Sequence, residues 1–369
     1  MNKAYKYRIY PTTEQREFFL RTFGCCRFIW NTMLSDKIAY YEEHGKMLHN
    51  TPAQYKADYP FLKEVDSLAL ANVQLHLQTA YANFFADKSV GFPKFKSKKH
   101  SKKRYTTNNQ NGTIRVTDGF IRLPKAGMVK AVIHRTAHED WCLKSATVSM
   151  EGDGTFYVSV LYEYRNEPLF SFIDESKIIG LDYKSDGLYM DSEGMCCDMP
   201  HYYRDAHKRL AKAQRKLKHK TAGSCNYNKQ QRRIAKIHRH VANQRKDYLH
   251  KCSAGITNRY DIICVESLNM RSMANKGFGN GKATLDNGYG MFLNMLAYKQ
   301  AEKGHLLIET DKFYPSSQLC HVCGYRQKLK LSDRTYICPI CHTVTDRDLN
   351  AAINIKSEGL RIYHAMISA

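Results

Sequence analysis

Acidic residues and long apolar runs are both scarce in this sequence. Only 35 Asp and Glu side chains offset 57 Lys and Arg side chains over 369 residues, so the formal net charge is +22. A chain with this charge repels itself unless an anionic partner is near, and nucleic acid or an acidic membrane surface is the expected partner. Charge alone does not select an activity, because a ribosomal or generic RNA-binding protein would have the same totals.

The shortage of apolar runs argues against a membrane protein. The N-terminus, MNKAYKYRIYP, has no apolar core and predicts no signal peptide. The longest uncharged stretch, 67–86, carries Asn, Gln, His and Thr side chains that are costly in hydrocarbon. Its spacing predicts instead a soluble amphipathic helix. The apolar face of that helix is expected to contain Leu68, Ala71, Leu75, Ala82 and Phe85.

Twelve cysteines could indicate a secreted disulfide framework, but the chain is large and has no secretion signal. Four of them form two Cys-x-x-Cys pairs separated by fourteen residues; these are Cys320, Cys323, Cys338 and Cys341. Four thiolates predict one closed tetrahedral Zn²⁺ site, structural rather than catalytic. His321 and His342 are then superfluous as ligands. The other eight cysteines are expected to be small core residues, and the compartment to be reducing and cytoplasmic.

The first half of the chain predicts a sheet interrupted by helices. Residues 3–10 alternate basic and apolar side chains, as a strand does, and residues 12–15 offer a capping box for a following helix. The buried stripe of that helix is expected to contain Phe19, Phe23, Cys26, Trp30 and Met33. From about 110 the period changes to two. Strands are expected at 114–116, 129–133, 147–150 and 156–164, with a turn at 151–154. Together they predict a small antiparallel barrel or sheet, completed by strand 3–10 and interrupted by the helical region 12–105.

Two strongly basic segments predict contacts with nucleic acid. Residues 94–104 contain seven basic residues and no acid, which favours a phosphate-contacting loop over a solvated linker. Residues 201–250 contain fifteen Lys or Arg against two Asp, and an apolar face from Ile234 to Cys252 predicts a helical hairpin with its loop at 221–228. The residues expected to bind nucleic acid are Lys3, Arg8, Lys94, Lys96, Lys98, Lys99, Arg209, Lys212, Arg215, Lys216, Arg232, Arg233, Lys236 and Arg245.

Three short segments each place a carboxylate beside an apolar stretch. Asp182 ends the strand-like run from 178, Glu266 ends the run from 260, and Asp348 precedes a helix. A carboxylate in an apolar strand is costly to bury unless it is paired or holds a metal. An RNase H-like sheet would bring three such acids together, where their oxygens suit Mg²⁺, and two ions about 4 Å apart would support phosphodiester hydrolysis. Taken singly, each acid could equally be a helix cap or a surface residue.

With these motifs in view, the sequence resembles the TnpB family, the transposon-encoded nucleases related to type V CRISPR effectors. Nearly the whole chain carries the resemblance. Its N-terminal part is KAYKYRIYPTTEQREFFLRTFGCCRFIWN, followed by GFPKFKSKK, LPKAGMVK, HYYRDAHKRLAKAQRKL and HVANQRKDYLHK. The most specific segments are FYPSSQLCHVCG and CPICHTVTDRDLNAAINI.

The resemblance implies a RuvC-like nuclease that uses a guide RNA from the transposon end to find and cut double-stranded DNA. Matched motif by motif, the catalytic acids that would hold two Mg²⁺ are Asp182 in GLDYKSDG, Glu266 in ICVES and Asp348 in DRDLNAA. Asp346 is the rival in the third motif, but the family's acid lies two residues before the Asn, which leaves Asp346 as a helix cap. Lys184 stands where the family often has Gly and would alter the turn or contact the substrate.

The resemblance also implies an α+β multidomain chain with a wedge-like β-barrel at 1–10 and 106–168 and a helical recognition domain at 11–105. An RNase H-like (RuvC) nuclease domain is expected at 169–314 and 346–369, interrupted by a zinc ribbon at 315–345 that binds target nucleic acid. A monomer bound to one RNA is expected. Two alternatives are a protein-only, structure-specific RuvC-type nuclease and an RNA-guided DNA-binding regulator that does not cleave.

Overall fold

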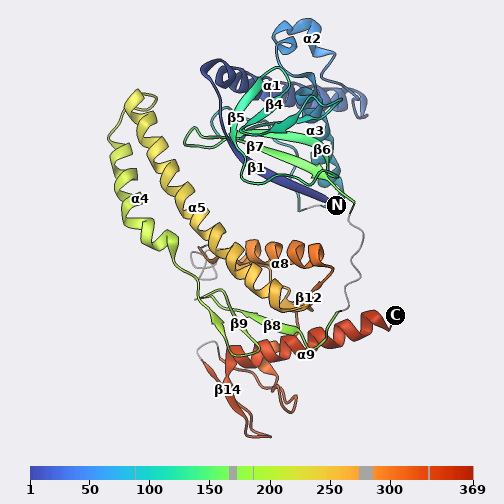
Figure 1. Cartoon of the computed structure of the whole chain (residues 1–369), viewed down its shortest axis with the longest axis vertical. Coiled ribbons are helices and arrows are strands. Elements are labelled where there is room, and N and C mark those ends of the chain that lie inside the picture. The colour runs from blue at the N-terminus through green and yellow to red at the C-terminus, as the bar shows by residue number, and fades with distance from the viewer. Residues whose placement is uncertain (88, 166–172, 186, 274–285, 331–332, 369) are drawn as a thin grey trace. The chain divides into compact units, whose positions relative to one another are not determined.

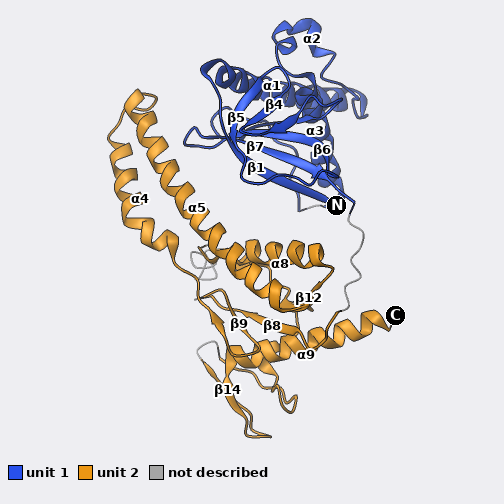
Figure 2. Ribbon diagram, viewed as in Figure 1, with its two compact units in different colours: residues 1–166 blue, residues 167–369 orange. Residues whose placement is uncertain are grey.

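The computed structural model describes the chain except residues 88, 166–172, 186, 274–285, 331–332 and 369 (Figure 1). The chain divides into two compact units, residues 1–166 and 167–369 (Figure 2). Both units mix helices with sheets, as the α+β expectation required. Among the described helices, none combines the length and the apolar character that crossing a bilayer demands.

Unit 1 is built on one antiparallel sheet with the strand order β2-β6-β7-β1-β5-β4-β3. The strands are β1 (Asn2–Tyr10), β2 (Lys103–Asn108), β3 (Arg115–Thr117), β4 (Phe120–Leu123), β5 (Gly127–Val132), β6 (Cys142–Met150) and β7 (Phe156–Glu163). The predicted N-terminal strand does complete the sheet, because β1 lies between β7 and β5, with Lys6 opposite Ser159 and Ile9 opposite Ala131. The described strands pair in an open order with edges β2 and β3, so no strand pairing among them closes the expected barrel.

The helices of unit 1 lie between β1 and β2 in the chain, as predicted. They are α1 (Thr13–His44), the short α2 (Tyr55–Asp58), the 3₁₀ turn η1 (Pro60–Lys63) and α3 (Ser67–Ala86). Thr12 caps α1 with both hydrogen bonds of the predicted capping box. All five residues of the predicted stripe of α1 are buried, and the Phe19 ring lies 5.9 Å from the Phe156 ring of the sheet. The sheet and α1 therefore share one core.

Helix α3 is where predicted, but the prediction of its buried face is wrong. Leu75 and Phe85, placed on that face, are 51% and 67% exposed. The buried apolar residues are Ala69, Leu70, Val73, Leu77 and Tyr81. Apolar side chains surround most of this helix, so their spacing is compatible with more than one buried face. Packing against α1 and β2 decided between the faces.

Unit 2 contains a five-stranded sheet with the order β10-β9-β8-β11-β12. Its strands are β8 (Ile178–Tyr183), β9 (Tyr189–Asp191), β10 (Cys196–Cys197), β11 (Ile262–Glu266) and β12 (Leu306–Thr310). β8, β11 and β12 run parallel, whereas β9 and β10 are antiparallel to their neighbours. The apolar runs at 178 and 260 are thus neighbouring strands, as the prediction of converging acids requires.

Helices cover both faces of this sheet. They are α4 (Tyr202–Lys218), α5 (Cys225–Arg259), α6 (Met270–Met273), α8 (Tyr289–Lys303) and α9 (Arg347–Ile367). Ile179 and Ile263 pack in a core with α5 and α8, while Ile178 and Ile262 pack in a second core with α9. Because side chains alternate along a strand, Asp182 and Glu266 share the face that α9 covers.

Two glycines let α9 approach the sheet closely. A Cβ atom at Gly180 of β8 would lie 2.2 Å from the main-chain oxygen of Ala352, and one at Gly359 of α9 would lie 2.1 Å from Cys264 Sγ. Such distances are far below van der Waals contact, so neither position tolerates a side chain without movement of the helix. The absence of a side chain at these two positions holds the start of α9 near the strand ends.

The predicted basic hairpin is formed by α4 and α5, which pack through Ala206, Leu210, Ile237 and Val241. Its loop is shorter than the predicted 221–228. Ser224 caps α5 by accepting a hydrogen bond from the amide of Tyr227, so residues 225–228 are already helical.

The remaining segment between β12 and α9 is small and contains the turn η3 (Ser316–Gln318) and the two-stranded sheet of β13 (Thr335–Ile337) and β14 (Val344–Asp346). It occupies the place in the chain where the zinc ribbon was predicted.

Candidate active site and zinc site

The first two predicted acids lie at the carboxyl ends of adjacent parallel strands. Leu181 of β8 is paired with Val265 of β11, so the next residues, Asp182 and Glu266, follow side by side. Glu266 is also paired with Thr310 at the end of β12. The carboxyl edge of a parallel sheet is the usual location of ligand sites in such folds.

The electrostatics of this edge disfavour charged carboxylates. Burial raises the pKa of Asp182 well above its ordinary value, and the charges of Glu266 and Asp348 raise it further. Burial likewise raises the pKa of Glu266, although a hydrogen bond from Ser316 opposes this shift. Each shift means that the anionic form lacks sufficient positive charge nearby. A cation bound here would supply the missing charge.

The third acid is brought to the same place by the start of α9. Asp346 is the helix cap, since its carboxylate accepts hydrogen bonds from the amides of Asp348 at 2.8 Å and Leu349 at 3.0 Å. The prediction that Asp346 is a cap is therefore confirmed. Asp348 lies in the first turn, where Arg347 Nη2 is 3.4 Å from its Oδ1, and its charge acts on Asp182. All three predicted acids thus meet at one edge of the sheet.

The donor set fits Mg²⁺, which binds carboxylate oxygens and keeps several waters. The three carboxylates are more widely spread than the four zinc-type thiols, which alone among the described groups bring all their ligand atoms within 4.8 Å of one another. Nearby buried hydroxyls of Tyr289 and Thr310 have no hydrogen-bond partner among the described residues. The charges of Asp182 and Glu266 act on Tyr289 and, after burial, raise its pKa. Unpaired polar atoms at an acidic edge are consistent with a hydrated ion site.

The predicted zinc cysteines form a compact four-thiol cluster. Cys320 Sγ lies 3.5 Å from Cys341 Sγ, and Cys323 Sγ lies 3.5 Å from Cys338 Sγ. Zn–S bonds of about 2.3 Å in a tetrahedron require sulfur–sulfur distances of about 3.8 Å, so the cluster fits zinc closely. Each knuckle turns through one residue with positive φ, Gly324 at 72° and His342 at 58°. The geometry of the cluster is consistent with a structural zinc site.

Two buried asparagines of α9 fasten the ribbon to the helix that carries Asp348. Asn350 Nδ2 donates to the main-chain oxygen of Leu319 at 2.6 Å, and Asn350 Oδ1 accepts from the amide of His321 at 3.1 Å. Asn354 Nδ2 donates to the oxygens of Ser316 and Leu319, both at 2.8 Å. The His321 ring contacts Asn350 Oδ1 at 2.9 Å, in keeping with its predicted exclusion from the zinc ligands.

The residues that support the acids were not identified from the sequence. Ser316, whose hydroxyl donates to Glu266, is buried and lies in the segment FYPSSQLCHVCG, in which the sequence pattern identifies only the cysteines. Asn350 and Asn354 belong to an amide-rich segment whose composition was apparent but whose contacts were not. The sequence feature that could have identified these two asparagines is their spacing of four residues, which places both amides on one face of the helix.

Lys184, the departure from the family pattern, points to the edge of the sheet. Its Nζ donates to Cys196 Sγ of β10 at 3.1 Å, and this hydrogen bond raises the pKa of Lys184. The charge of Asp348 also raises it, so the ammonium group lies within electrostatic reach of the acids. The lysine is accommodated without any positive φ at its position.

The expectation that the other eight cysteines are core residues holds for Cys25, Cys26 and Cys264 only. Cys142, Cys196 and Cys225 are exposed, and Cys197 and Cys252 are partly buried. Cys197 also has a thiol partner, because its Sγ lies 3.7 Å from Cys252 Sγ. The two residues are 55 positions apart, so sequence spacing could not reveal their contact.

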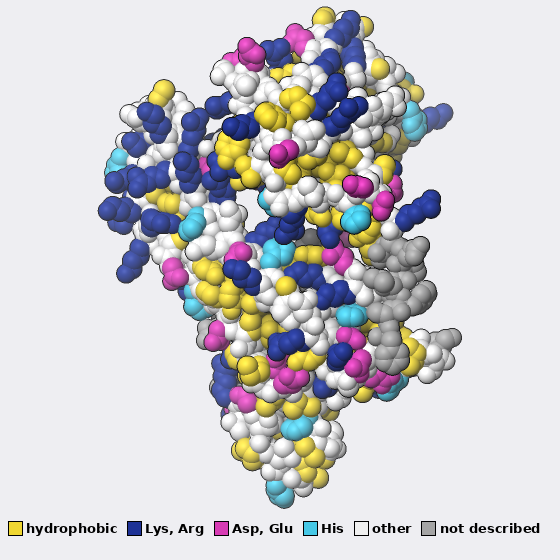
Figure 3. All heavy atoms as spheres, in the orientation of Figure 1, with side chains coloured by type: hydrophobic (Ala, Val, Ile, Leu, Met, Phe, Trp, Pro, Cys, Tyr) yellow, Lys and Arg dark blue, Asp and Glu magenta, His cyan; other side chains and the backbone are white. Residues whose placement is uncertain are grey.

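The predicted nucleic-acid-binding residues of the hairpin lie on its surface, with one exception. Lys and Arg side chains gather over α4 and α5 in Figure 3. Exposed members on this hairpin are Arg209, Lys212, Arg215, Lys216, Arg232, Arg233 and Lys236. Arg245 instead pairs at 2.8 Å with Asp286, whose side chain is only 2% exposed. Its first role is therefore to neutralise a buried acid.

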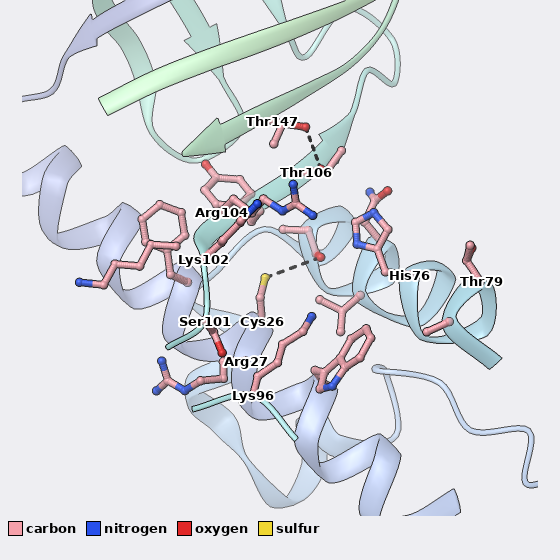
Figure 4. Close-up of a pocket in the computed structure, with 18 of the residues that line it drawn as sticks. Cys26, Arg27, His76, Thr79, Lys96, Ser101, Lys102, Arg104, Thr106 and Thr147 are labelled. Atoms are coloured by element: carbon pink, nitrogen blue, oxygen red, sulfur yellow. Dashed lines mark hydrogen bonds between the residues drawn. The ribbon is translucent and has the colours of Figure 1, made fainter. Parts of the chain in front are cut away.

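In unit 1 the predicted basic loop closes a pocket of about 620 Å³. Lys96, Arg104 and His76 point toward one another across it (Figure 4). Lys96 Nζ lies 3.3 Å from the centre of the Trp30 ring, and burial together with the charge of Arg104 lowers its pKa to about 8. Lys94, Lys98 and Lys99 of this loop and Arg8 of β1 are exposed, while Lys3 is partly buried, 5.8 Å from the Trp141 ring. A cationic pocket with an aromatic floor suits a phosphate-bearing ligand.

Comparisons with known proteins agree with these features. Three family models match the chain: a helix-turn-helix domain over residues 1–46, "Probable transposase" over 174–277, and a Cas12f1-like TNB domain over 289–355, which spans the four-cysteine cluster. A Streptomyces pristinaespiralis protein named "Putative RNA-guided DNA endonuclease" is 34% identical over 98% of this chain and 90% of its own. The Escherichia coli K12 protein "Putative RNA-guided DNA endonuclease InsQ" is 28% identical over 99% and 93%.

A solved structure has the same fold. The protein chain of a Cas12f1–guide RNA–target DNA complex superposes with a TM-score of 0.63, covering 96% of this chain and 98% of that chain. The two sequences are 12% identical, so the similarity concerns the fold.

Proposed function

Because the chain belongs to the TnpB family, we propose that it is an RNA-guided DNA endonuclease with Asp182, Glu266 and Asp348 as its catalytic acids. One observation carries the proposal. Three carboxylates from segments spread over 166 residues meet at the carboxyl edge of one sheet, and two of them, Glu266 and Asp348, act electrostatically on the third, Asp182. A structural ion-pair network would contain matching cations, whereas among the described residues three acids raise the pKa of Asp182 and Arg347 opposes them.

Asp182, Glu266 and Asp348 would hold two Mg²⁺ ions, which would activate a water and stabilise the leaving 3′ oxygen during phosphodiester hydrolysis. Other residues of the chain fix the positions of these acids at the carboxyl edge of the sheet. Ser316 orients Glu266 by donating to its Oε1, and the cap at Asp346 orients the first turn of α9. Burial makes Asp182 and Glu266 costly to ionise unless positive charge is nearby.

The positions of the strongly basic segments indicate which surfaces bind nucleic acid. The net +13 of residues 201–250 suits the phosphate backbone of a folded RNA, and the pocket at Lys96 adds a second cationic surface in unit 1. In this arrangement base pairing with the guide reads the target sequence, while the protein binds the shape of the heteroduplex and a short flanking motif. We assign the wedge role to the sheet of unit 1, recognition to its helices, and target binding to the zinc ribbon.

The test is guide-dependent cleavage by the purified protein–RNA complex with Mg²⁺ and a matched double-stranded target. Asp182→Ala and Glu266→Ala are expected to abolish cleavage while leaving RNA and target binding intact. Asp346→Asn is the matched control, because an amide oxygen still caps α9. Equal cleavage by the RNA-free protein would overturn the guide requirement and favour a protein-only nuclease.

One observation favours a non-cleaving regulator as a second candidate: Lys184 replaces the small residue expected beside the first acid and its charge reaches Asp348. Lys184→Gly separates the two. A nuclease cleaves with Lys184 in place, whereas guide-dependent binding without cleavage by the unaltered protein, with cleavage gained in Lys184→Gly, identifies a regulator whose nuclease site Lys184 keeps inactive.

A further inference from the structure

The two-residue edge strand β10 places one cysteine against the long helix α5. Cys197 Sγ donates to Cys252 Sγ at 3.7 Å. Among the described hydrogen bonds outside the zinc cluster, this one alone joins two cysteine sulfurs. Both residues are partly buried rather than enclosed in the core. The contact has no role in the nuclease chemistry proposed above.

The surroundings make one of the two thiols reactive. The Cys197 thiol donates its hydrogen bond to Cys252, which lowers the pKa of Cys252 to about 7 and raises that of Cys197. The ammonium group of Lys299 also lowers the pKa of Cys252. That ammonium group is held in place by the Ser253 hydroxyl at 2.7 Å. A thiolate is the nucleophile in cysteine chemistry, and a positively charged, partly exposed environment is where reactive cysteines occur.

We propose that Cys197 and Cys252 form a peroxide-sensitive dithiol that closes reversibly to an intramolecular disulfide joining β10 to α5. A disulfide needs its sulfurs at about 2.05 Å, so the pair must close by about 2 Å. The edge strand can supply this movement, because β10 has two residues and, among the described strands, pairs with β9 alone. Disulfides in reducing compartments are usually of this transient, redox-sensing kind.

The reaction balances with peroxide as the oxidant. The Cys252 thiolate attacks the O–O bond of hydrogen peroxide, which forms a sulfenic acid and releases hydroxide. The Cys197 thiol then attacks the sulfenic sulfur, forming the S–S bond, and its proton leaves with the sulfenic hydroxyl as water. The hydroxide from the first step takes up the proton that the Cys252 thiol released when it ionised. Two thiols and one peroxide thus give one disulfide and two waters. A dithiol reductant reverses the step by thiol–disulfide exchange.

The consequence is a covalent link between the nuclease sheet and the basic hairpin. Cys197 is paired with Tyr189 of β9, which is paired with Tyr183 of β8, the residue after Asp182. Cys196, next to Cys197, is hydrogen-bonded to Lys184. The oxidised form therefore fixes the outer strand of the sheet to α5 at the same level as the acidic edge.

The experiment uses the full-length, zinc-loaded protein. It is treated with graded hydrogen peroxide, free thiols are blocked with N-ethylmaleimide, and peptides are mapped by mass spectrometry without reductant. We expect a cross-linked peptide containing Cys197 and Cys252, lighter than the two free peptides by two hydrogen atoms. Dithiothreitol added before the block should restore labelling at both positions.

Cys225→Ser, at an exposed cysteine, is the matched control and should retain the cross-link. Cys197→Ser should lose it and leave a Cys252 sulfenic acid that dimedone traps, and Cys252→Ser tests the same loss should the first variant fail to fold. The proposal is overturned if Cys197 and Cys252 both stay labelled at doses that oxidise Cys225. It is equally overturned if Cys252 is oxidised without forming the cross-link.

Discussion

Asn350 Nδ2 lies 2.6 Å from the main-chain oxygen of Leu319, the residue immediately before the first zinc-binding cysteine. The donor belongs to the helix that carries Asp348 two residues earlier, and the acceptor belongs to the ribbon. The four-cysteine cluster and Asp348, the third proposed catalytic acid, are therefore joined by a buried amide as well as by the chain.

Asn350→Leu should impair cleavage without removing zinc. The substitution removes the amide that serves the Leu319 oxygen and the His321 N–H. Asn354 still donates to the Leu319 oxygen, so the His321 N–H loses its partner, at a cost of about 1–3 kcal/mol. We expect guide-dependent cleavage to fall at least tenfold while zinc content, measured by atomic absorption, stays at one ion per chain. Asn294→Ala on the exposed side of α8 is the control.

Cys338→Ser provides the contrasting case. It removes a predicted zinc ligand and thereby also weakens the ribbon that supports α9. Zinc, thermal stability of unit 2 and cleavage should decrease together. A zinc-free Cys338→Ser protein that folds and cuts normally would refute the coupling between the ribbon and the acid.

Gly180→Ala should destabilise unit 2 strongly. Its Cβ would lie 2.2 Å from the Ala352 oxygen, so α9 must move away from β8 and carry Asp348 with it. We expect a loss of about 3 kcal/mol in the free energy of unfolding, measured by denaturant titration, because overpacking against a backbone atom cannot be relieved by rotamer changes. Gly255→Ala on α5, where a Cβ would meet nothing within 4 Å, should be neutral or stabilising.

Lys96 should make the affinity of unit 1 for nucleic acid pH-dependent. Burial lowers the pKa of this lysine to about 8, so the free protein loses the charge as pH rises through 8, and phosphate binding must then restore it. We expect affinity to be full at pH 7 and to fall by pH 9, measured by fluorescence anisotropy with a DNA duplex. Lys96→Met should bind more weakly at pH 7 and lose the pH dependence. An unchanged pH profile in Lys96→Met would show that another group titrates.

The lowered pKa of Lys96 also changes the stability of the folded protein with pH. Charged Lys96 is less stable in the folded protein than in the unfolded chain, so its charge lowers the free energy of unfolding. This destabilisation is fully present at pH 7. It disappears as the pH rises from about 8, the pKa in the folded protein, toward 10.5, the ordinary lysine pKa that applies in the unfolded chain. Lys96→Met should therefore raise the melting temperature at pH 7 more than at pH 10.

Charge removal on the hairpin should separate binding from stability. Lys212, Arg215 and Lys216 are exposed, so replacing all three by Gln should lower the salt dependence of RNA binding by about 2 in slope with little change in melting temperature. Arg245→Gln should do the reverse, because it leaves the buried Asp286 without its ion-pair partner and costs about 3 kcal/mol. Nitrocellulose filter binding across a salt series and thermal melting distinguish the two effects.

The sequence by itself determined which residue types could perform the chemistry. Two Cys-x-x-Cys pairs define a four-thiolate ligand set, and apolar runs ending in Asp182 and Glu266 identify strands with an expensive carboxylate at the end, because ligand chemistry and strand periodicity are local properties. The sequence also predicts the helix cap at Asp346, since capping depends on the next three residues along the chain. Local rules likewise sufficed for the capping box of α1 and its buried stripe.

Only the tertiary structure decided which groups meet. Leu75 and Phe85 were assigned to a buried face, but packing against α1 and β2 selected another side of α3. Ser316 reaches Glu266 across 50 residues, and Cys197 reaches Cys252 across 55. Such contacts depend on how strands and helices pack in three dimensions, where a side chain's partner is set by the fold and not by its distance along the chain.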